Sequence, residues 1–396
     1  MTQPSFMSSL NGRVNALHET GIVEVAQYGW DRPDLIRFWF GEGDVQTPAF
    51  ICQAASDAMF AGETFYTDQR GIRPLRDALA AYMTRTFGLP IGEERITLTT
   101  SGMGGLDLIM MMLLDPGDEV VIVGPVWPNI FSTVFLNQGT VRHASVRLTA
   151  DDWVLDLDDL FAQVTDRTKA IFVNSPNNPT GWMMEADQQK ALMDFARARG
   201  IWVVADEVYH QLVFDREVAP SFLNVAEPED RLLVVNSFSK SWLMTGWRLG
   251  WITHPAGLGE TLAKLVQITT SGAPQFLHRG AIAALEQGDH VIADLKARCK
   301  AGRDITFDRL ESWPRIRAVR PKAAFYAFFA VDGMTDSVAY CKALIDGASV
   351  GLAPGSAFGP GGEGYIRLCF AAEEATLRRG LDRLAPMLGA GTDQAA

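Results

Sequence analysis

The 396-residue sequence has only four cysteines, and no two of them form a C-x-x-C pair. Zinc-binding and thiol redox motifs are therefore not expected. No run approaches the roughly 20 apolar residues that a membrane-spanning helix needs. Residues 1–14 also lack the basic stretch and apolar core of a secretory signal. We expect reduced, structural cysteines, no metal and a cytoplasmic location.

Positive charge is also scarce, because 35 Lys and Arg residues face 47 Asp and Glu residues, giving a net charge of −12. This balance argues against nucleic acid or an anionic membrane as a partner. What the chain does contain is 47% hydrophobic and 21% charged residues. That composition is typical of a globular protein with a large core.

Between residues 95 and 255, short apolar runs rich in β-branched residues alternate with helical patterns. The runs lie at 96–100, 119–123, 169–174, 201–206, 231–236 and 249–253. Continuously apolar strands separated by helices are typical of a mostly parallel sheet that is covered on both faces. The sequence therefore predicts an α/β fold.

After residue 285 the pattern changes to that of a smaller α+β domain. We expect a charged helix at 288–311 and a final helix at 373–388. We also expect two strands, at 325–331 and 365–371, and a glycine-rich loop at 351–365. The first 45 residues carry a polar helix and little core of their own. The predicted division is a large cofactor-binding domain over 46–285 and a small domain made of 1–45 with 286–396.

Polar residues break the apolar runs where the predicted strands end. Asp206 closes one run, Trp127 and Asn178 follow two others, and the turn SGMGG (101–105) follows the run at 96–100. The segment SFSK places Lys240 after the run at 231–236. Ligands of such sheets gather at the carboxyl ends of the strands, so these side chains are expected to meet there.

Lys240 lies among three serines, Ser237, Ser239 and Ser241, and Arg248 follows eight residues later. Lysine is rarely buried for stability, because desolvating an ammonium group is costly. Burial does make a lysine amine less basic and more nucleophilic. The segment therefore predicts a reactive amine.

Each of these residues also has a structural explanation when it is taken singly. Asp206 could cap a helix, Trp127 could belong to the core, and Lys240 could extend to solvent. Arg367, within YIRLCFA (365–371), could form a structural ion pair, and SGMGG could be a plain turn.

Together the same residues meet the needs of a phosphorylated aromatic aldehyde. The amine would form an imine, and the glycine turn, the hydroxyls and the guanidinium would hold the phosphate. The indole would stack on the ring, and the carboxylate would keep a ring nitrogen protonated, so that the ring withdraws electrons.

Six segments resemble motifs of the class I/II aminotransferases, which are fold-type-I pyridoxal-phosphate enzymes of the aspartate aminotransferase type. They are GEGDVQTP (41–48), YTDQRGIRPLR (66–76), SPNNPTG (175–181), ADEVY (205–209), SFSKSWLMTGWRLG (237–250) and YIRLCFA (365–371). The resemblance covers nearly the whole chain. It implies a large domain with a mostly parallel seven-stranded sheet flanked by helices, a smaller α+β domain, and pyridoxal 5'-phosphate as cofactor.

The resemblance also implies a role for each residue at the cofactor. Lys240 would hold the cofactor covalently and move the proton, and Asp206 would pair with the pyridine nitrogen. Asn178 and Tyr209 would bind the ring oxygen, with Tyr209 counted among the catalytic residues, and Trp127 would stack on the ring. The implied phosphate ligands are Gly102, Met103, Ser237, Ser239, Arg248 and, from a neighbouring subunit, Tyr66.

For the substrate, the resemblance implies that Arg367 grips the α-carboxylate, with help from Gly41 and Asn178. Tyr66 implies a homodimer with shared sites. The implied reaction is ping-pong transfer of an amino group from an L-amino acid to a 2-oxo acid, with 2-oxoglutarate as the expected acceptor.

Two other functions stay open at this point. A C–S β-lyase would use the same Lys240, Asp206 and Arg367. A cofactor-sensing regulator would need an added DNA-binding domain, which neither the acidic charge nor the short stretch before the motifs favours.

The side chain of the amino donor is also open. The helix after SGMGG offers no cation for a second carboxylate. Four aromatic residues could form an aromatic entrance to the site or belong to the core: Tyr28, Trp30, Trp39 and Phe40.

Overall fold

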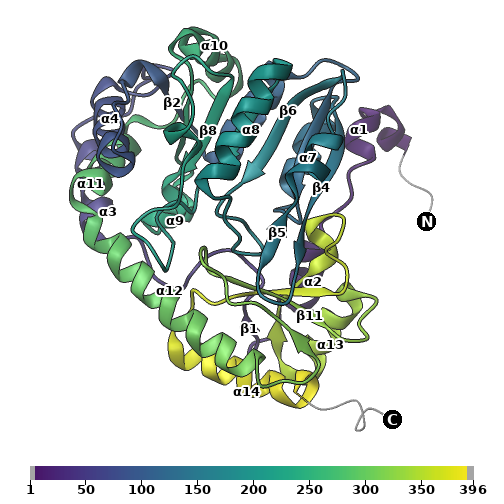
Figure 1. Cartoon of the computed structure of the whole chain (residues 1–396). Helices are drawn as coiled ribbons and strands as arrows, with labels where there is room; N and C mark the ends of the chain where they lie inside the picture. The colour runs from purple at the N-terminus through teal and green to yellow at the C-terminus, as the bar shows by residue number, and fades with distance from the viewer. Residues whose placement is uncertain (1–4, 390–396) are drawn as a thin grey trace.

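The structure, a computed structural model, describes residues 5–389 and shows an α/β architecture (Figure 1). Its main sheet has eight strands in the order β2-β9-β8-β7-β6-β3-β4-β5. In chain order these are β2 (Ile96–Thr99), β3 (Glu119–Gly124), β4 (Thr140–Leu148), β5 (Trp153–Leu155), β6 (Thr168–Asn174), β7 (Trp202–Asp206), β8 (Leu232–Ser237) and β9 (Gly250–Thr253). The α/β fold and all six strands expected from apolar runs are confirmed.

The sheet is mostly parallel, as predicted, but it has one strand more than the seven that the resemblance implies. Strands β4, β3, β6, β7 and β8 pair in parallel, whereas β9 and the short edge strand β5 run antiparallel to their neighbours. Neither β4 nor β5 was expected from the sequence. In β4 the apolar run is interrupted by Arg142, His143 and Arg147, because this strand lies near the edge and is only partly buried.

Alternate residues of the central strands point into two separate cores, which is why their runs are continuously apolar. Val120, Ile122 and Val204 pack on one face, whereas Val121 and Val203 pack on the other. The first face is covered by α5 (Gly102–Leu113), α6 (Asn129–Leu136) and α10 (Gly259–Thr269). The second face is covered chiefly by α3 (Ala49–Phe60), α4 (Arg73–Phe87), α7 (Leu157–Ala162), α8 (Ala186–Arg199) and α11 (Gln275–Gln287).

A four-stranded antiparallel sheet of order β10-β11-β14-β13 lies beside the main sheet. Its strands are β10 (Ile316–Arg317), β11 (Tyr326–Val331), β13 (Ala353–Pro354) and β14 (Tyr365–Cys369). The N-terminal segment joins this part of the protein, because β1 (Ile36–Arg37) pairs in parallel with β12 (Val350–Gly351). The helices here are α2 (Gly21–Gly29), α12 (Asp289–Leu310), α13 (Ser337–Ala348) and α14 (Glu374–Leu388).

The long helix α12 runs from the main sheet to the small one (Figure 1). It confirms the helix expected over 288–311, and α14 confirms the final helix. The remaining short helices are α1 (Gly12–Asn15), α9 (Phe238–Ser241) and the 3-10 turns Ser5–Ser9, Glu93–Arg95, Phe222–Asn224, Thr245–Trp247, Ala256–Leu258 and Gly355–Phe358. The division at residues 46 and 285 stays a prediction, and residues 1–4 and 390–396 of the predicted small domain lie outside the described residues.

The glycine-rich stretch 351–365 is more ordered than the loop that the sequence predicted. It contains β13 and a 3-10 helix, and its buried Phe358 accepts a hydrogen bond from Val126 N–H at 3.0 Å. The glycines permit close packing here: a Cβ on Gly355 would lie 2.1 Å from the carbonyl oxygen of Gly362. The expectation of a loop was therefore wrong for its first half.

All four cysteines are free thiols; Cys52 is exposed, and Cys299, Cys341 and Cys369 are buried. Within residues 5–389, no helix combines the length and the apolar character needed to cross a bilayer.

Candidate active site

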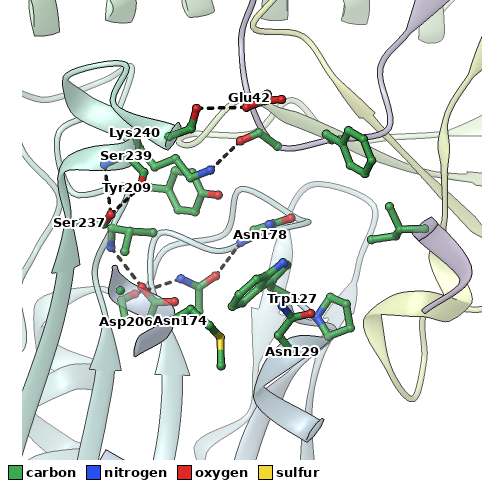
Figure 2. A pocket seen from close by; sticks show the side chains of 18 of the residues that line it. Glu42, Trp127, Asn129, Asn174, Asn178, Asp206, Tyr209, Ser237, Ser239 and Lys240 are labelled. Atoms are coloured by element: carbon green, nitrogen blue, oxygen red, sulfur yellow. Dashed lines mark hydrogen bonds between the residues drawn. The ribbon is translucent and has the colours of Figure 1, made fainter. Parts of the chain in front are cut away.

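A cavity of about 540 Å³ opens at the carboxyl ends of the parallel strands, between the main sheet and the small one. Side chains from both parts of the protein line it (Figure 2). It brings together twelve of the thirteen residues predicted from the sequence: Gly41, Gly102, Met103, Trp127, Asn178, Asp206, Tyr209, Ser237, Ser239, Lys240, Arg248 and Arg367.

Asp206 is the last residue of β7 and lies buried at the floor of this cavity. Burial raises the pKa of its carboxyl group to about 7, and neither the hydrogen bond from Val208 N–H nor the attraction of Lys240 cancels this effect. Asn174 fixes the strand end, because its side-chain amide donates to the Asp206 carbonyl oxygen at 3.0 Å. The site therefore holds a carboxylate that a cationic ligand group would stabilise.

Lys240 belongs to the short helix α9, directly after β8. Its Nζ donates a hydrogen bond of 2.6 Å to the carbonyl oxygen of Gly41 (Figure 2). Desolvation lowers the pKa of this amine to about 8. Roughly a tenth of the amine is thus in the neutral, nucleophilic form at pH 7, far more than for an ordinary lysine, as the sequence predicted.

One end of the cavity is built to hold an anion. Helix α5 begins at Gly102, so its N-terminus lies at this end, after Ser101 with a positive φ of 101°. The backbone passes very close here, since a Cβ on Gly250 would lie 2.6 Å from Gly102 N. The hydroxyls of Ser237 and Ser239, 2.9 Å apart, and the exposed Arg248 complete this end.

The opposite side of the cavity contains Arg367 on β14, which is 2% exposed. Its guanidinium donates to Asn178 Oδ1 at 3.0 Å and to the carbonyl oxygen of Trp39. Its Nε is buried and has no hydrogen-bond partner within the described part of the chain. A buried guanidinium with an unused donor is suited to a carboxylate ligand.

Tyr326 is a site residue that the sequence analysis missed. It is fully buried on β11, its hydroxyl lies 2.7 Å from that of Tyr209, and its ring lies 4.7 Å below the guanidinium of Arg367. A Cβ on Gly41 would lie 2.2 Å from the Tyr326 hydroxyl, which explains the glycine there. In the run FYAFFAV, Tyr326 cannot be distinguished from an aromatic residue of the core. Only the pairing of β11 with β14 could have shown that Tyr326 lies at the site.

Tyr66 is the predicted residue that the cavity does not include. It is 91% exposed and lies near residues 270–274, apart from the cavity of its own chain.

Of the four aromatic residues that the sequence left open between an entrance and the core, one lines the cavity. Trp39 is buried in the core, and Tyr28 and Trp30 are not among the cavity's lining residues; the Tyr28 hydroxyl instead binds Asp346. Phe40 does line the cavity. Other lining residues were not expected, among them Thr20, Ile22 and Val23 at the start of α2.

The arrangement fits pyridoxal phosphate. Asp206 offers an acceptor for a protonated ring nitrogen, and the turn at Gly102 with Ser237, Ser239 and Arg248 offers donors for a phosphate. Lys240 offers a nucleophilic amine within the same cavity, and the half-buried indole of Trp127 lines its wall.

Comparisons with known proteins agree with the geometry. The family described as aminotransferase class I and II matches residues 34–384. Aspartate aminotransferase of Thermotoga maritima is 33% identical over 356 residues, which cover 90% of this chain and 92% of that protein. A probable N-acetyl-LL-diaminopimelate aminotransferase of Bacillus subtilis is 32% identical, covering 95% and 94%.

Solved structures give the same result. Alanine aminotransferase from Pyrococcus furiosus has a TM-score of 0.90 at 27% identity and covers 96% of this chain and 99% of its own. Because the family match spans most of the sequence and the fold agrees over nearly all of it, the chain belongs to the class I and II aminotransferases and is a pyridoxal-phosphate-dependent enzyme that transfers amino groups.

Proposed function

We propose that the enzyme moves the amino group of an L-amino acid to a 2-oxo acid by a ping-pong reaction. The observation that carries this proposal is the placement of Lys240 and Arg367 in one cavity. Both are hydrogen-bonded to the same short segment, Lys240 to the carbonyl of Gly41 and Arg367 to that of Trp39. An amino acid held at Arg367 by its carboxylate would therefore present its α-carbon toward the lysine.

In this proposal the chain's own residues hold the cofactor at both ends. Asp206 pairs with the ring nitrogen, and Trp127 covers one face of the ring. The ring oxygen is bound by Asn178 and Tyr209. The phosphate is bound by the backbone at Gly102 and Met103 and by Ser237, Ser239 and Arg248. The bound cofactor supplies an electron sink for the bond that is broken at the substrate.

Lys240 has two tasks in the proposed reaction. Its amine attaches the cofactor between turnovers. With cofactor and amino acid bound, its free Nζ would accept the proton that leaves the substrate's α-carbon. The lowered pKa of about 8 suits both tasks, because a proton acceptor works best with a pKa near the operating pH.

Arg367 binds the α-carboxylate of every substrate, with Asn178 and the backbone at Gly41 beside it. Tyr326 is a positioning residue in this scheme. It supports the guanidinium from below and fixes the Tyr209 hydroxyl, so it links the carboxylate site to the ring-oxygen site.

We also propose a homodimer in which Tyr66 reaches the phosphate in the partner's site. The support is the exposure of Tyr66 and its neighbour Phe65, which are 91% and 80% exposed and line one surface hollow with residues 270–274. Exposed patches of this kind mark interaction surfaces. The division into domains at residues 46 and 285 and the cytoplasmic location belong to the same proposal.

The proposed reaction is tested with holoenzyme and a panel of L-amino acids, with 2-oxoglutarate and pyruvate as alternative acceptors. Conversion of the donor to its 2-oxo acid, with the nitrogen recovered in the second product, is the expected outcome. Release of free ammonia and pyruvate from cysteine conjugates without an acceptor would instead indicate a β-lyase.

The shared site is tested by mixing two inactive variants, Lys240→Ala and Tyr66→Ala. In a hybrid dimer, the site with an intact Lys240 receives Tyr66 from the other chain, so mixing should restore activity. No recovery from verified hybrids would show that Tyr66 does not act in the partner's site.

A further inference from the structure

The donor's side chain is left open by the family, yet the cavity of this chain has features that select it. We propose that the end of the cavity next to α2 takes uncharged, apolar side chains, so that substrates are L-amino acids and 2-oxo acids with a single carboxylate. This inference rests on the proposed function and specifies its substrate class.

The first argument is the charge of the cavity wall. Among the described lining residues, the cationic ones are Lys240, Arg248 and Arg367. The proposed reaction uses all three, at the amine, the phosphate and the α-carboxylate. A second carboxylate on the substrate would then find no cation within the described wall, and an unpaired carboxylate is costly to desolvate.

The second argument is an acidic side chain that the reaction does not use. Glu42 lines the cavity beside Lys240, and its Oε2 accepts a hydrogen bond of 3.1 Å from Thr245 Oγ1. Asp206 is matched by the ring nitrogen, whereas the proposed reaction brings no cationic group of the substrate or cofactor to Glu42. A substrate with a distal carboxylate would therefore be repelled as well as unpaired.

The third argument is apolar surface that stays open to the cavity. Val23 and Phe40 are 37% and 36% exposed, although residues of these types are usually buried in a core. Ile22 and Pro128 line the same cavity. Open apolar surface on a concave wall is where apolar ligand groups bind.

The start of α2 is a feature that would attract an anion, because helix N-termini carry partial positive charge. Here its first turn already contains the carboxylate of Glu24, which pairs with Lys342 at 2.7 Å. Thr20 also accepts hydrogen bonds from Val23 N–H and Glu24 N–H. These groups offset the attraction, so we do not place a substrate carboxylate there.

The same cavity serves both half-reactions, and so the inference extends to the acceptor. The distal carboxylate of 2-oxoglutarate would meet the same wall as that of glutamate. Pyruvate and branched or aromatic 2-oxo acids are thus expected to react faster than 2-oxoglutarate, which is the acceptor implied by the resemblance.

The test is a single-turnover reaction of holoenzyme with individual donors, followed by the absorbance of the bound cofactor. L-leucine, L-methionine and L-phenylalanine should react at least about 10²-fold more efficiently than L-aspartate and L-glutamate. If a charged donor matches or exceeds the apolar ones, the inference is wrong and the proposed function stands. If no donor reacts, both are wrong.

A charge placed in the wall gives a second, independent readout. Val23→Arg should raise the ratio of glutamate to leucine efficiency by about 10-fold, since it adds the missing cation. Each ratio is measured within one protein, so a partly unfolded sample does not affect it. The matched control Val14→Arg changes an exposed valine outside the cavity and should leave the ratio unchanged. An unchanged ratio in Val23→Arg would overturn the placement of the side-chain end at α2.

Discussion

The carboxyl group of Asp206 should make the cofactor-free enzyme less stable at neutral pH than a neutral side chain would. Burial raises its pKa from 3.8 to about 7. A rise of about three units corresponds to a cost of about 4 kcal/mol for the ionised form. Asp206→Asn keeps an oxygen for the Val208 N–H and removes the charge, so the cofactor-free variant should be the more stable protein at pH 8.

The direction in which the free energy of unfolding changes with pH follows from which state holds the Asp206 proton. Between pH 4 and 7 the unfolded chain has released the Asp206 proton, whereas the folded protein still holds it. The free energy of unfolding of the wild type therefore falls as the pH rises through this window. The variant has no such proton, so its advantage over the wild type should grow by about 3 kcal/mol between pH 5 and pH 8.

The measurement is urea unfolding of cofactor-free wild type, Asp206→Asn and the control Asp31→Asn at pH 5 and pH 8. Asp31 is exposed, so its replacement should have little effect at either pH. The neighbouring Glu207, whose pKa burial raises to about 8, is present in all three proteins. An advantage of Asp206→Asn that is equal at both pH values, or larger at pH 5, would refute the argument.

Three further predictions concern activity. Lys240→Ala should abolish amino transfer, and borohydride reduction of the wild type should attach the cofactor to Lys240; a label on another lysine would contradict its assignment. Arg367→Lys should raise KM for every donor while the Kd of the cofactor stays the same, since lysine cannot bind a carboxylate with two parallel hydrogen bonds; weaker cofactor binding with unchanged KM would place Arg367 at the cofactor. Gly41→Ala should lower kcat/KM at least 10-fold, because its Cβ would meet the Tyr326 hydroxyl at 2.2 Å. Adding Tyr326→Phe should then restore part of the loss in steady-state assays, and no recovery would show that this contact is not the cause.

The sequence could predict the central strands and the residues at their ends, because both depend on local patterns. A strand buried on both faces is continuously apolar, and a polar residue that ends such a run is conspicuous. Asp206 and Lys240 were found in this way. The strand β4, which lies next to the edge strand β5, was missed because its less buried positions carry charged residues and break the apolar run.

The other omissions concern residues whose role depends on contacts distant in the sequence. Tyr326 lies in an aromatic run typical of core, and it reaches the site only because β11 pairs with β14 opposite Arg367. Ile22 and Val23 line the cavity because α2 packs against the small sheet, which no local pattern shows. For Trp39 the sequence left entrance and core open; its side chain is buried in the core and its carbonyl oxygen reaches Arg367.

In the segment from Trp39 to Gly41, the side chains and the backbone carbonyls have separate roles. The carbonyl oxygens of Gly41 and Trp39 accept hydrogen bonds from Lys240 and Arg367, and every amino acid supplies a carbonyl. A complete set of substitutions at Trp39 would therefore report on core packing and leave the hydrogen bond to Arg367 undetected. At Gly41 the same set of substitutions would report on the clash that an added Cβ causes. It would not report on the hydrogen bond that the Gly41 carbonyl accepts from Lys240. Replacing the backbone amide by an ester would weaken the carbonyl acceptor itself, and that chemistry, not mutagenesis, is what can reveal how much these two contacts contribute.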